Sequence, residues 1–214
     1  MKQQAIDAAP VVFVVDDDID VRDGLRSLMG SVGLRCEVFA SPRKFLQRAA
    51  ADMVSCLVLD VRLPGMSGLD FQAELAGTHA DIPIIFITGH GDIPMSVRAM
   101  KAGAVEFLTK PVREQTLLDA VRVALERDRV RREQAEKLRD LQARYELLSP
   151  RECEVLSLVI TGPLNKEMAA EMQVSEVTVK VHRGSLMKKL GAKSLPDLVK
   201  IAGVLGVVPR SVKR

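Results

Sequence analysis

The stretch SCLVLDVRLPGMSG, residues 55–68, starts as an apolar run and ends in a turn. Its first part, SCLVL at 55–59, is predicted to form a strand, and the carboxylate of Asp60 follows directly. A basic residue, a proline and two glycines come next, which is typical of a turn. An isolated acid at the end of such a strand needs partners from other parts of the chain.

Four other short runs have strand character, and helix-like stretches lie between them. Three of the five are continuous apolar runs, as expected of parallel strands covered on both faces. Helices are predicted to begin near Asp20 and after the N-cap residues Ser41, Ser67 and Asp92. This alternation predicts an α/β fold, a (βα)5 doubly wound parallel sheet of about 110 residues. The four runs are VVFVV (11–15), LRCEVF (34–39), IPIIFIT (82–88) and VEFL (105–108).

The composition favours two domains with aliphatic cores in a reducing compartment. The 214 residues are 47% hydrophobic but only 3% aromatic, and there is no Trp. No apolar run approaches the roughly 20 residues of a membrane span. The N-terminal segment MKQQAIDAAP has no apolar stretch typical of a secretory signal. We therefore expect a cytoplasmic protein without membrane contact. Cys36, Cys56 and Cys153 are far apart and odd in number, which favours reduced thiols, with Cys56 a small core residue.

The charge is unevenly distributed along the chain. Residues from Ser149 onward include 11 Lys/Arg and 6 Asp/Glu, whereas the preceding part has 20 and 22. A basic C-terminal part favours a polyanionic partner for that part alone.

Polar residues follow the predicted strands at the sheet edge where ligands bind in doubly wound folds. Three carboxylates, one hydroxyl and one ammonium should meet there. Crowded carboxylates require a cation, and Mg²⁺ suits oxygen ligands. A carboxylate can also attack phosphorus and form an aspartyl-phosphate. The five residues are Asp16, Asp17, Asp60, Thr88 and Lys110.

The motifs VVDDD, VLDVRLPGMSG, ITGHGD and EFLTKP resemble the receiver domain of two-component response regulators, over about residues 10–125. The resemblance implies that Asp60 is the phosphoacceptor. It further implies that Asp17 and Asp60 bind Mg²⁺ with the backbone carbonyl of Arg62, and that Asp16 assists through water.

The same resemblance assigns the remaining pocket residues. Thr88 would donate a hydrogen bond to the phosphoryl group and Lys110 would contact it as a point charge, with a cis Lys110-Pro111 bond. Phe107 would be the aromatic switch residue, although a core role fits that residue equally well. His90 is more often structural than functional in such a position, and the side chain of Arg62 has no assigned role.

The last receiver helix is predicted to begin near Val112 and to continue through the charged segment 126–146, which has no Gly or Pro. Leu138, Leu141, Tyr145 and Leu148 form a short apolar stripe there. The segment is either a solvated linker helix or a short coiled coil between two copies. We therefore expect a receiver at 10–125, a helical linker at 126–147 and a second domain at 148–214.

The second domain shows helix signals only. SPRE at 149–152 is a capping box, and Asn165, Ser175 and Ser194 with Asp197 are predicted to cap three more short helices. The third helix lies in SEVTVKVHRGSLMKKLG, 175–191, and ends at Gly191. The inward-facing residues are predicted to be Val177, Val181, Leu186 and Leu190.

A short helix followed by this basic helix favours a helix-turn-helix, although a bundle with a cationic face has the same charge pattern. LSPRECEVL, NKEMAAEM and SEVTVKVHRGSLMKKLG resemble the LuxR-type output domain of the NarL/FixJ class, over about residues 147–207. The resemblance implies that Lys180, flanked by Val179 and Val181, enters the major groove. Thr178, Arg183 and Lys188 would contact phosphates, and Gly184 would leave one base contact unmade.

The fourth helix has two interpretations. In the class that the domain resembles it forms a dimer surface, which here would include Leu198, Val199, Ala202 and Leu205. The same residues would equally well complete the core of the domain.

The sequence thus predicts a phosphorylation-dependent DNA-binding transcriptional regulator, most simply an activator, and not an enzyme beyond assisting its own phosphorylation and dephosphorylation. The implied partners are a sensor histidine kinase, promoter DNA, RNA polymerase and a second copy of the chain upon phosphorylation. One alternative is an Asp-nucleophile phosphatase, but such enzymes have a second acid two residues after the first, where this chain has Arg62. The other is a DNA-binding regulator that works without phosphorylation, which the intact set of pocket residues argues against.

Overall fold

The computed structural model describes residues 9–48, 53–78 and 82–210, and the chain divides into two compact units. The N-terminal unit comprises Met1–Arg132 and the C-terminal unit Glu133–Arg214. Each unit has its own hydrophobic core, so the two are described separately.

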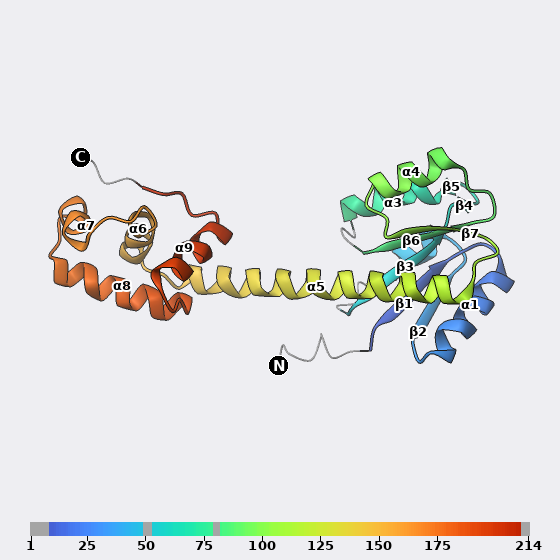
Figure 1. The fold of residues 1–214 in the computed structure, drawn as a ribbon, viewed down its shortest axis with the longest axis horizontal. Helices are drawn as coiled ribbons and strands as arrows, with labels where there is room; N and C mark the ends of the chain where they lie inside the picture. The colour runs from blue at the N-terminus through green and yellow to red at the C-terminus, as the bar shows by residue number, and fades with distance from the viewer. Residues whose placement is uncertain (1–8, 49–52, 79–81, 211–214) are drawn as a thin grey trace. The chain divides into compact units, whose positions relative to one another are not determined.

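The N-terminal unit is built on a five-stranded sheet in the order β2-β1-β3-β6-β7, in which every neighbouring pair is parallel (Figure 1). The predicted α/β doubly wound fold is therefore confirmed. The strands are β1 (Val11–Val15), β2 (Arg35–Phe39), β3 (Ser55–Asp60), β6 (Ile84–Thr88) and β7 (Glu106–Thr109).

Helices cover both faces of this sheet. On one face, side chains of α2, α3 and α4 pack against β-strand residues such as Phe13 and Phe86. On the other, α1 and α5 pack against residues such as Val14 and Cys56, so Cys56 is a core residue as predicted. The helices are α1 (Ile19–Ser31), α2 (Pro42–Leu46), α3 (Gly68–Thr78), α4 (Ile93–Lys101) and α5 (Glu114–Glu146).

The turn after β3 contains an element that the sequence did not indicate. Its residues form an antiparallel hairpin of β4 (Arg62–Leu63) and β5 (Met66–Ser67), and Gly65 between them has a φ of 82°. The predicted N-cap role of Ser67 is confirmed, because Ser67 directly precedes α3, which begins at Gly68, and its Oγ accepts the backbone N–H of Leu69 at 3.2 Å. The predicted caps Ser41 and Asp92 are confirmed, since each side chain accepts a backbone N–H.

Helix α5 is anchored to the sheet by a buried carboxylate. Asp128 is fully buried and accepts the backbone N–H of Ser55, the first residue of β3, at 2.9 Å. Its oxygens also accept hydrogen bonds from the guanidinium groups of Arg131 and Arg132. Hydrogen bonds and ion pairs of this kind offset the free-energy cost of burying a carboxylate.

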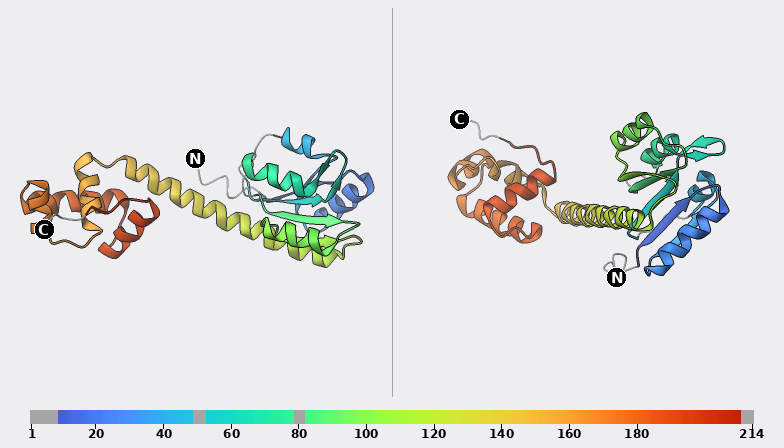
Figure 2. Two further views of the ribbon diagram at one scale, coloured as in Figure 1. Left: turned by 90° about the horizontal axis from the view of Figure 1, so that it is seen from above. Right: turned by 45° about the vertical axis from the view of Figure 1, so that its right-hand side comes forward.

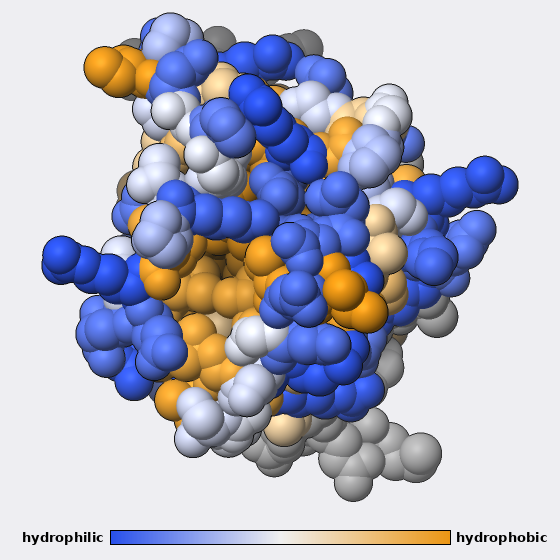
Figure 3. Space-filling model, turned by 90° about the vertical axis from the view of Figure 1, so that its right-hand side faces the viewer, coloured by the Kyte–Doolittle hydropathy of each residue, from blue (hydrophilic) through white to orange (hydrophobic). Residues whose placement is uncertain are grey.

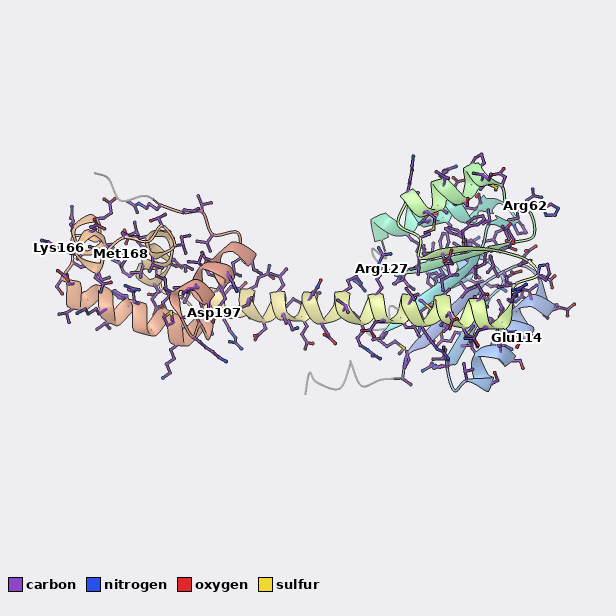
Figure 4. The ribbon with its side chains drawn as sticks, viewed as in Figure 1. Arg62, Glu114, Arg127, Lys166, Met168 and Asp197 are labelled. Atoms are coloured by element: carbon purple, nitrogen blue, oxygen red, sulfur yellow. The ribbon has the colours of Figure 1, made fainter. Side chains whose placement is uncertain are left out.

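The C-terminal unit consists of helices around the aliphatic cluster that includes Leu156, Met168 and Leu186 (Figure 2). Figure 4 shows Met168 directed into this group of helices, while Lys166, on the same helix, lies at its outer edge. The helices following α5 are α6 (Pro150–Val159), α7 (Asn165–Met172), α8 (Glu176–Leu190) and α9 (Leu195–Val204).

Three of the four predicted caps of this unit are confirmed. Ser149, Ser175 and Ser194 each accept a backbone N–H at their helix start, and Ser149 forms the capping box with Glu152. The prediction for Asn165 is wrong. Leu164 is the N-cap residue of α7, with its own N–H bound by the Glu167 carboxylate, and Asn165 is the first helical residue.

The inward face of α8 also differs from the prediction. Leu186 and Leu190 are buried as expected, but Val177 and Val181 are exposed and Val179 is the fully buried valine. The predicted stripe was out of phase in the first two turns, because Val179, seven residues before Leu186, shares the helix face of Leu186 and Leu190, whereas Val177 and Val181 lie on the opposite face. On α9, Leu198 and Ala202 lie in the core, whereas Val199 is exposed.

Among the described residues, every helix is too short or too polar to cross a membrane.

Candidate functional site

The predicted acidic pocket is present at the carboxyl ends of the strands. The Nζ atom of Lys110, just after β7, lies 2.8 Å from Oδ2 of Asp60 and 2.7 Å from Oδ2 of Asp16. Asp60 is the last residue of β3, and Asp16 follows β1 directly. The Lys110-Pro111 peptide bond is cis, as the resemblance implies. One ammonium group therefore joins two carboxylates from different strands.

The buried position of Asp16 affects its protonation and that of its partner. Burial raises the pKa of the Asp16 carboxyl, and its hydrogen bonds from Lys110 and the backbone N–H of Asp18 only partly offset this. Burial by itself would lower the pKa of Lys110, but the hydrogen bonds to Asp16 and Asp60 outweigh it and raise the pKa. The lysine is therefore held in its charged form next to Asp60.

A third carboxylate completes an oxygen-rich cluster. One oxygen each of Asp16, Asp17 and Asp60 lie within 4.8 Å of one another, and Asp17 is exposed. Oδ1 of Asp60 accepts the N–H of Arg62 at 3.1 Å, which brings the backbone of Arg62 against the same cluster. Three carboxylates around a single lysine leave excess negative charge, and this donor set suits a hard divalent cation.

The remaining predicted residues lie beside the pocket. Thr88, the last residue of β6, is fully buried, and its Oγ1 accepts the N–H of His90 at 3.2 Å. The ring of Phe107 is half-buried and lies 6.2 Å from that of Phe86. The side chain of His90 is exposed.

Two glycines leave space that this site requires, and sequence reasoning did not single them out. A Cβ on Gly68 would lie 2.3 Å from the carbonyl oxygen of Asp60. A Cβ on Gly91 would lie 2.8 Å from Cε1 of Phe107 and 3.0 Å from Cγ2 of Thr88. Real Cβ atoms essentially never approach other heavy atoms this closely. The only sequence signal for Gly68 and Gly91 is their position in the short segments MSG and GHG. Such a segment does not reveal which atoms lie next to each Cβ position.

The face of the unit around the strand ends is open to other molecules. Figure 4 shows Arg62 and Glu114 at the same end of the N-terminal unit, opposite the end where Arg127 lies. Seen from that end, the surface has a hollow lined by hydrophobic side chains and bordered by hydrophilic ones (Figure 3). Ile19 and Ile93, the first residues of the helices after β1 and β6, are exposed at 61% and 78%.

In the C-terminal unit, the structure separates the predicted DNA-contacting residues into two groups. Lys180, Val181, Gly184 and Lys188 are exposed on α8, and the position of a Cβ on Gly184 is open space. The other two predicted side chains have partners within the unit. The hydroxyl of Thr178 is hydrogen-bonded to that of Ser175, and the guanidinium of Arg183 donates to Oδ1 of Asn165.

A buried ion pair fixes α8 against α6. The capping-box motif in the sequence indicated only part of this interaction. The carboxylate of Glu152 accepts hydrogen bonds from Ser185 and from Nζ of Lys189, and Lys189 also donates to the carbonyl of Leu147. These bonds, led by that of Lys189, lower the pKa of Glu152 to about 2. The exposed face of α8 is thus presented from a fixed position on α6.

Comparisons with known proteins identify a family for each of the two parts of the chain. Residues 12–122 match the response regulator receiver domain family, and residues 146–202 match the luxR family of bacterial regulatory proteins. This chain is a response regulator. It belongs to the response regulators that combine a receiver with a LuxR-type DNA-binding domain, and the predicted family is confirmed.

Relatives of this response regulator align over nearly its whole length. Nodulation protein W of Bradyrhizobium diazoefficiens is 57% identical, over 92% of this chain and 87% of that protein. Response regulator protein TmoT of Ectopseudomonas mendocina is 50% identical, over 94% and 91%. The solved structure of response regulator StyR, 49% identical, has a TM-score of 0.82 over 92% of this chain and 99% of that chain. Full-length FixJ from B. japonicum, 35% identical, has a TM-score of 0.54 over 92% and 98%.

Proposed function

We propose that a sensor histidine kinase phosphorylates this response regulator on Asp60, and that this phosphorylation controls promoter binding through α8. The observation that carries the proposal is the ion pair from Lys110 to both Asp60 and Asp16. The proposed parts are the phosphoacceptor domain at 10–125, the helical linker at 126–147 and the DNA-binding domain at 148–214.

The pocket supplies the groups that phosphoryl transfer requires. A carboxylate oxygen of Asp60 attacks the phosphorus, and the bond from phosphorus to the donor atom breaks as the new P–O bond forms. The ammonium of Lys110 and the hydroxyl of Thr88 are placed to stabilise the charge on the transferred group. Both are held before the reaction, Lys110 by two carboxylates and Thr88 by the fold of β6.

The donor atoms around Asp60 fit Mg²⁺. Asp17, Asp60 and the backbone carbonyl of Arg62 would bind it directly, and Asp16 would assist through water. When bound, the ion supplies charge neutralisation for the transferring phosphoryl oxygens. Because Lys110 occupies one oxygen each of Asp16 and Asp60, the exposed Asp17 is the carboxylate that remains most accessible.

Phosphorylation would be transmitted through Thr88 and Phe107, which meet at Gly91. A new charge on Asp60 draws the Thr88 hydroxyl toward it, and the Phe107 ring turns inward, which changes the surface of α4 and β7. Ile93, Val97 and Met100 are exposed on α4 at helical spacing. They supply an apolar surface for homodimerisation upon phosphorylation.

In the DNA-binding domain, Lys180 and Val181 are the base-reading residues of this proposal, and Lys188 contacts phosphate. Thr178 and Arg183 can contact phosphate only by exchanging their present partners Ser175 and Asn165. The bound dimer would act as an activator that recruits RNA polymerase. Its role in transcription is supported by two relatives named transcriptional regulatory proteins, TdiR and FixJ, which align with 89% and 92% of this chain.

The test is phosphorylation of the full chain by acetyl phosphate with Mg²⁺, followed by intact mass. We expect a gain of one phosphoryl group in the wild type and in the control Asp119→Asn, an exposed acid on α5, and none in Asp60→Asn. DNA affinity should rise with the phosphorylated fraction. A phosphoryl group that persists in Asp60→Asn would reject the assigned phosphoacceptor. A wild type that releases phosphate continuously but never accumulates the phosphoryl group would favour the phosphatase alternative.

A further inference from the structure

The exposed face of α8 carries an apolar surface in its first two turns. Val177 and Val181 are 69% and 65% exposed, and they stand one above the other at i, i+4 spacing. Gly184 and Lys188 continue the same face, and Lys180 borders it. We call the pair Val177 and Val181 the valine pair.

The orientation of the valine pair is fixed by the rest of the helix. Val179, Leu186 and Leu190 are buried in the core of the unit, and Ser175 caps the helix at the N–H of Thr178. Rotating α8 to bury the pair would expose these three core residues. Neither valine belongs to an apolar cluster of the described residues, so packing in the core does not explain why these two side chains are apolar.

The polar residues near the pair limit what this face can recognise. A major-groove reader makes its bidentate contacts to bases through Asn, Gln, Arg or Lys. The exposed face from Val177 to Lys188 has no Asn or Gln, and its one arginine, Arg183, donates to Asn165. What remains exposed is the valine pair with Lys180 and Lys188.

The chemistry that fits is DNA with thymine methyl groups in its major groove. Recognition helices contact base edges with their N-terminal residues, and Val177 is the second residue of α8. Apolar side chains distinguish thymine through its 5-methyl group. The positive charges of Lys180 and Lys188 on the same exposed part of α8 complement a polyanion, which favours DNA over an apolar protein partner.

We propose that Val177, together with Val181, is a specificity-determining residue that reads thymine methyl groups. This inference rests on the proposed DNA-binding function of α8. Four residues of helix rise about 6 Å, and neighbouring base pairs are about 3.4 Å apart. The valine pair therefore reads two thymines about two base-pair steps apart in each half-site.

The test replaces thymine by deoxyuridine, which lacks only the 5-methyl group. A preferred site is first selected from random DNA with the full chain, with and without acetyl phosphate and Mg²⁺. Each thymine of a half-site is then replaced in turn, and affinity is measured by fluorescence anisotropy. Losing one methyl contact should weaken wild-type binding about fourfold at the two positions that the valine pair contacts.

The variant Val177→Ala tests the contribution of Val177 separately from that of Val181. This variant should be insensitive to deoxyuridine at one of the two positions and retain sensitivity at the other. Val208→Ala, a 79% exposed valine beyond α9, is the matched control and should behave like the wild type at both. Circular dichroism checks that the variants are folded.

The outcomes separate this inference from the function on which it rests. A preferred site that the wild type binds equally well with deoxyuridine at every position overturns the role of the valine pair alone. Equal deoxyuridine sensitivity in Val177→Ala and the wild type overturns the role of Val177. Failure to select any preferred site overturns the proposed DNA-reading function as well.

Discussion

Replacing Gly68 by alanine should displace the phosphoacceptor. The new Cβ would lie 2.3 Å from the carbonyl oxygen of Asp60 and 3.1 Å from Cα of Val61, and ordinary contact begins at 3.4 Å. Both neighbours are backbone atoms, so no side-chain rotation relieves the overlap. The backbone at Asp60 must move by about 1 Å, and a shift of that size can cost about 100-fold in rate when reacting groups are prealigned.

The assay is the initial rate of mass increase with acetyl phosphate and Mg²⁺. We expect Gly68→Ala to react about 100-fold more slowly than the wild type. Overpacking also costs about 1–3 kcal/mol of stability, so urea unfolding is measured and rates are compared at equal fractions folded. Gly89→Ala, whose Cβ would meet nothing within 4 Å, should react at the wild-type rate. A folded Gly68→Ala protein within threefold of the wild-type rate would refute the reasoning.

Two further predictions concern the switch and the C-terminal unit. Gly91→Ala should reduce the gain in DNA affinity upon phosphorylation about tenfold, because the new methyl group overpacks the Phe107 ring. Adding Phe107→Ala should restore part of this gain. If the double variant shows no restored gain, the ring is not involved. Glu152→Gln should flatten the pH dependence of unfolding. With a folded-state pKa of about 2 against an ordinary 4.5, the carboxylate contributes at most about 3 kcal/mol above pH 4.5, which is lost as the pH falls through 2. Urea unfolding from pH 7 to pH 2 measures this, and a variant with the wild-type slope would contradict it.

Much of the N-terminal unit was predictable because its signals are local. Each strand is a short apolar run with a polar residue at its end, and parallel topology then places Asp16, Asp60 and Lys110 at one edge. The hairpin after Asp60 was not predictable in this way. It depends on Gly65 adopting a positive φ, which a turn-like composition permits without requiring it.

The C-terminal unit was harder to predict in detail. In VTVKV three valines alternate with polar residues, and composition alone does not show which of them is buried. The partners of Arg183 and Glu152 come from other helices and leave no local signal. Asn165 has the residue type of a cap, yet the capping carboxylate is that of Glu167. Tertiary contacts decided the positions of Arg183 and Glu152, and a local contact within α7 decided that of Asn165.

The hydrogen bond from Ser55 to Asp128 bears on where the receiver can be cut. A fragment that ends at residue 125 would lose this acceptor and leave the first N–H of β3 without its partner, at the opposite end of the strand from Asp60. It would also lose the two guanidinium groups that neutralise the acid. A receiver fragment should therefore extend to Arg132, where the N-terminal unit ends, and not stop at the proposed boundary at residue 125.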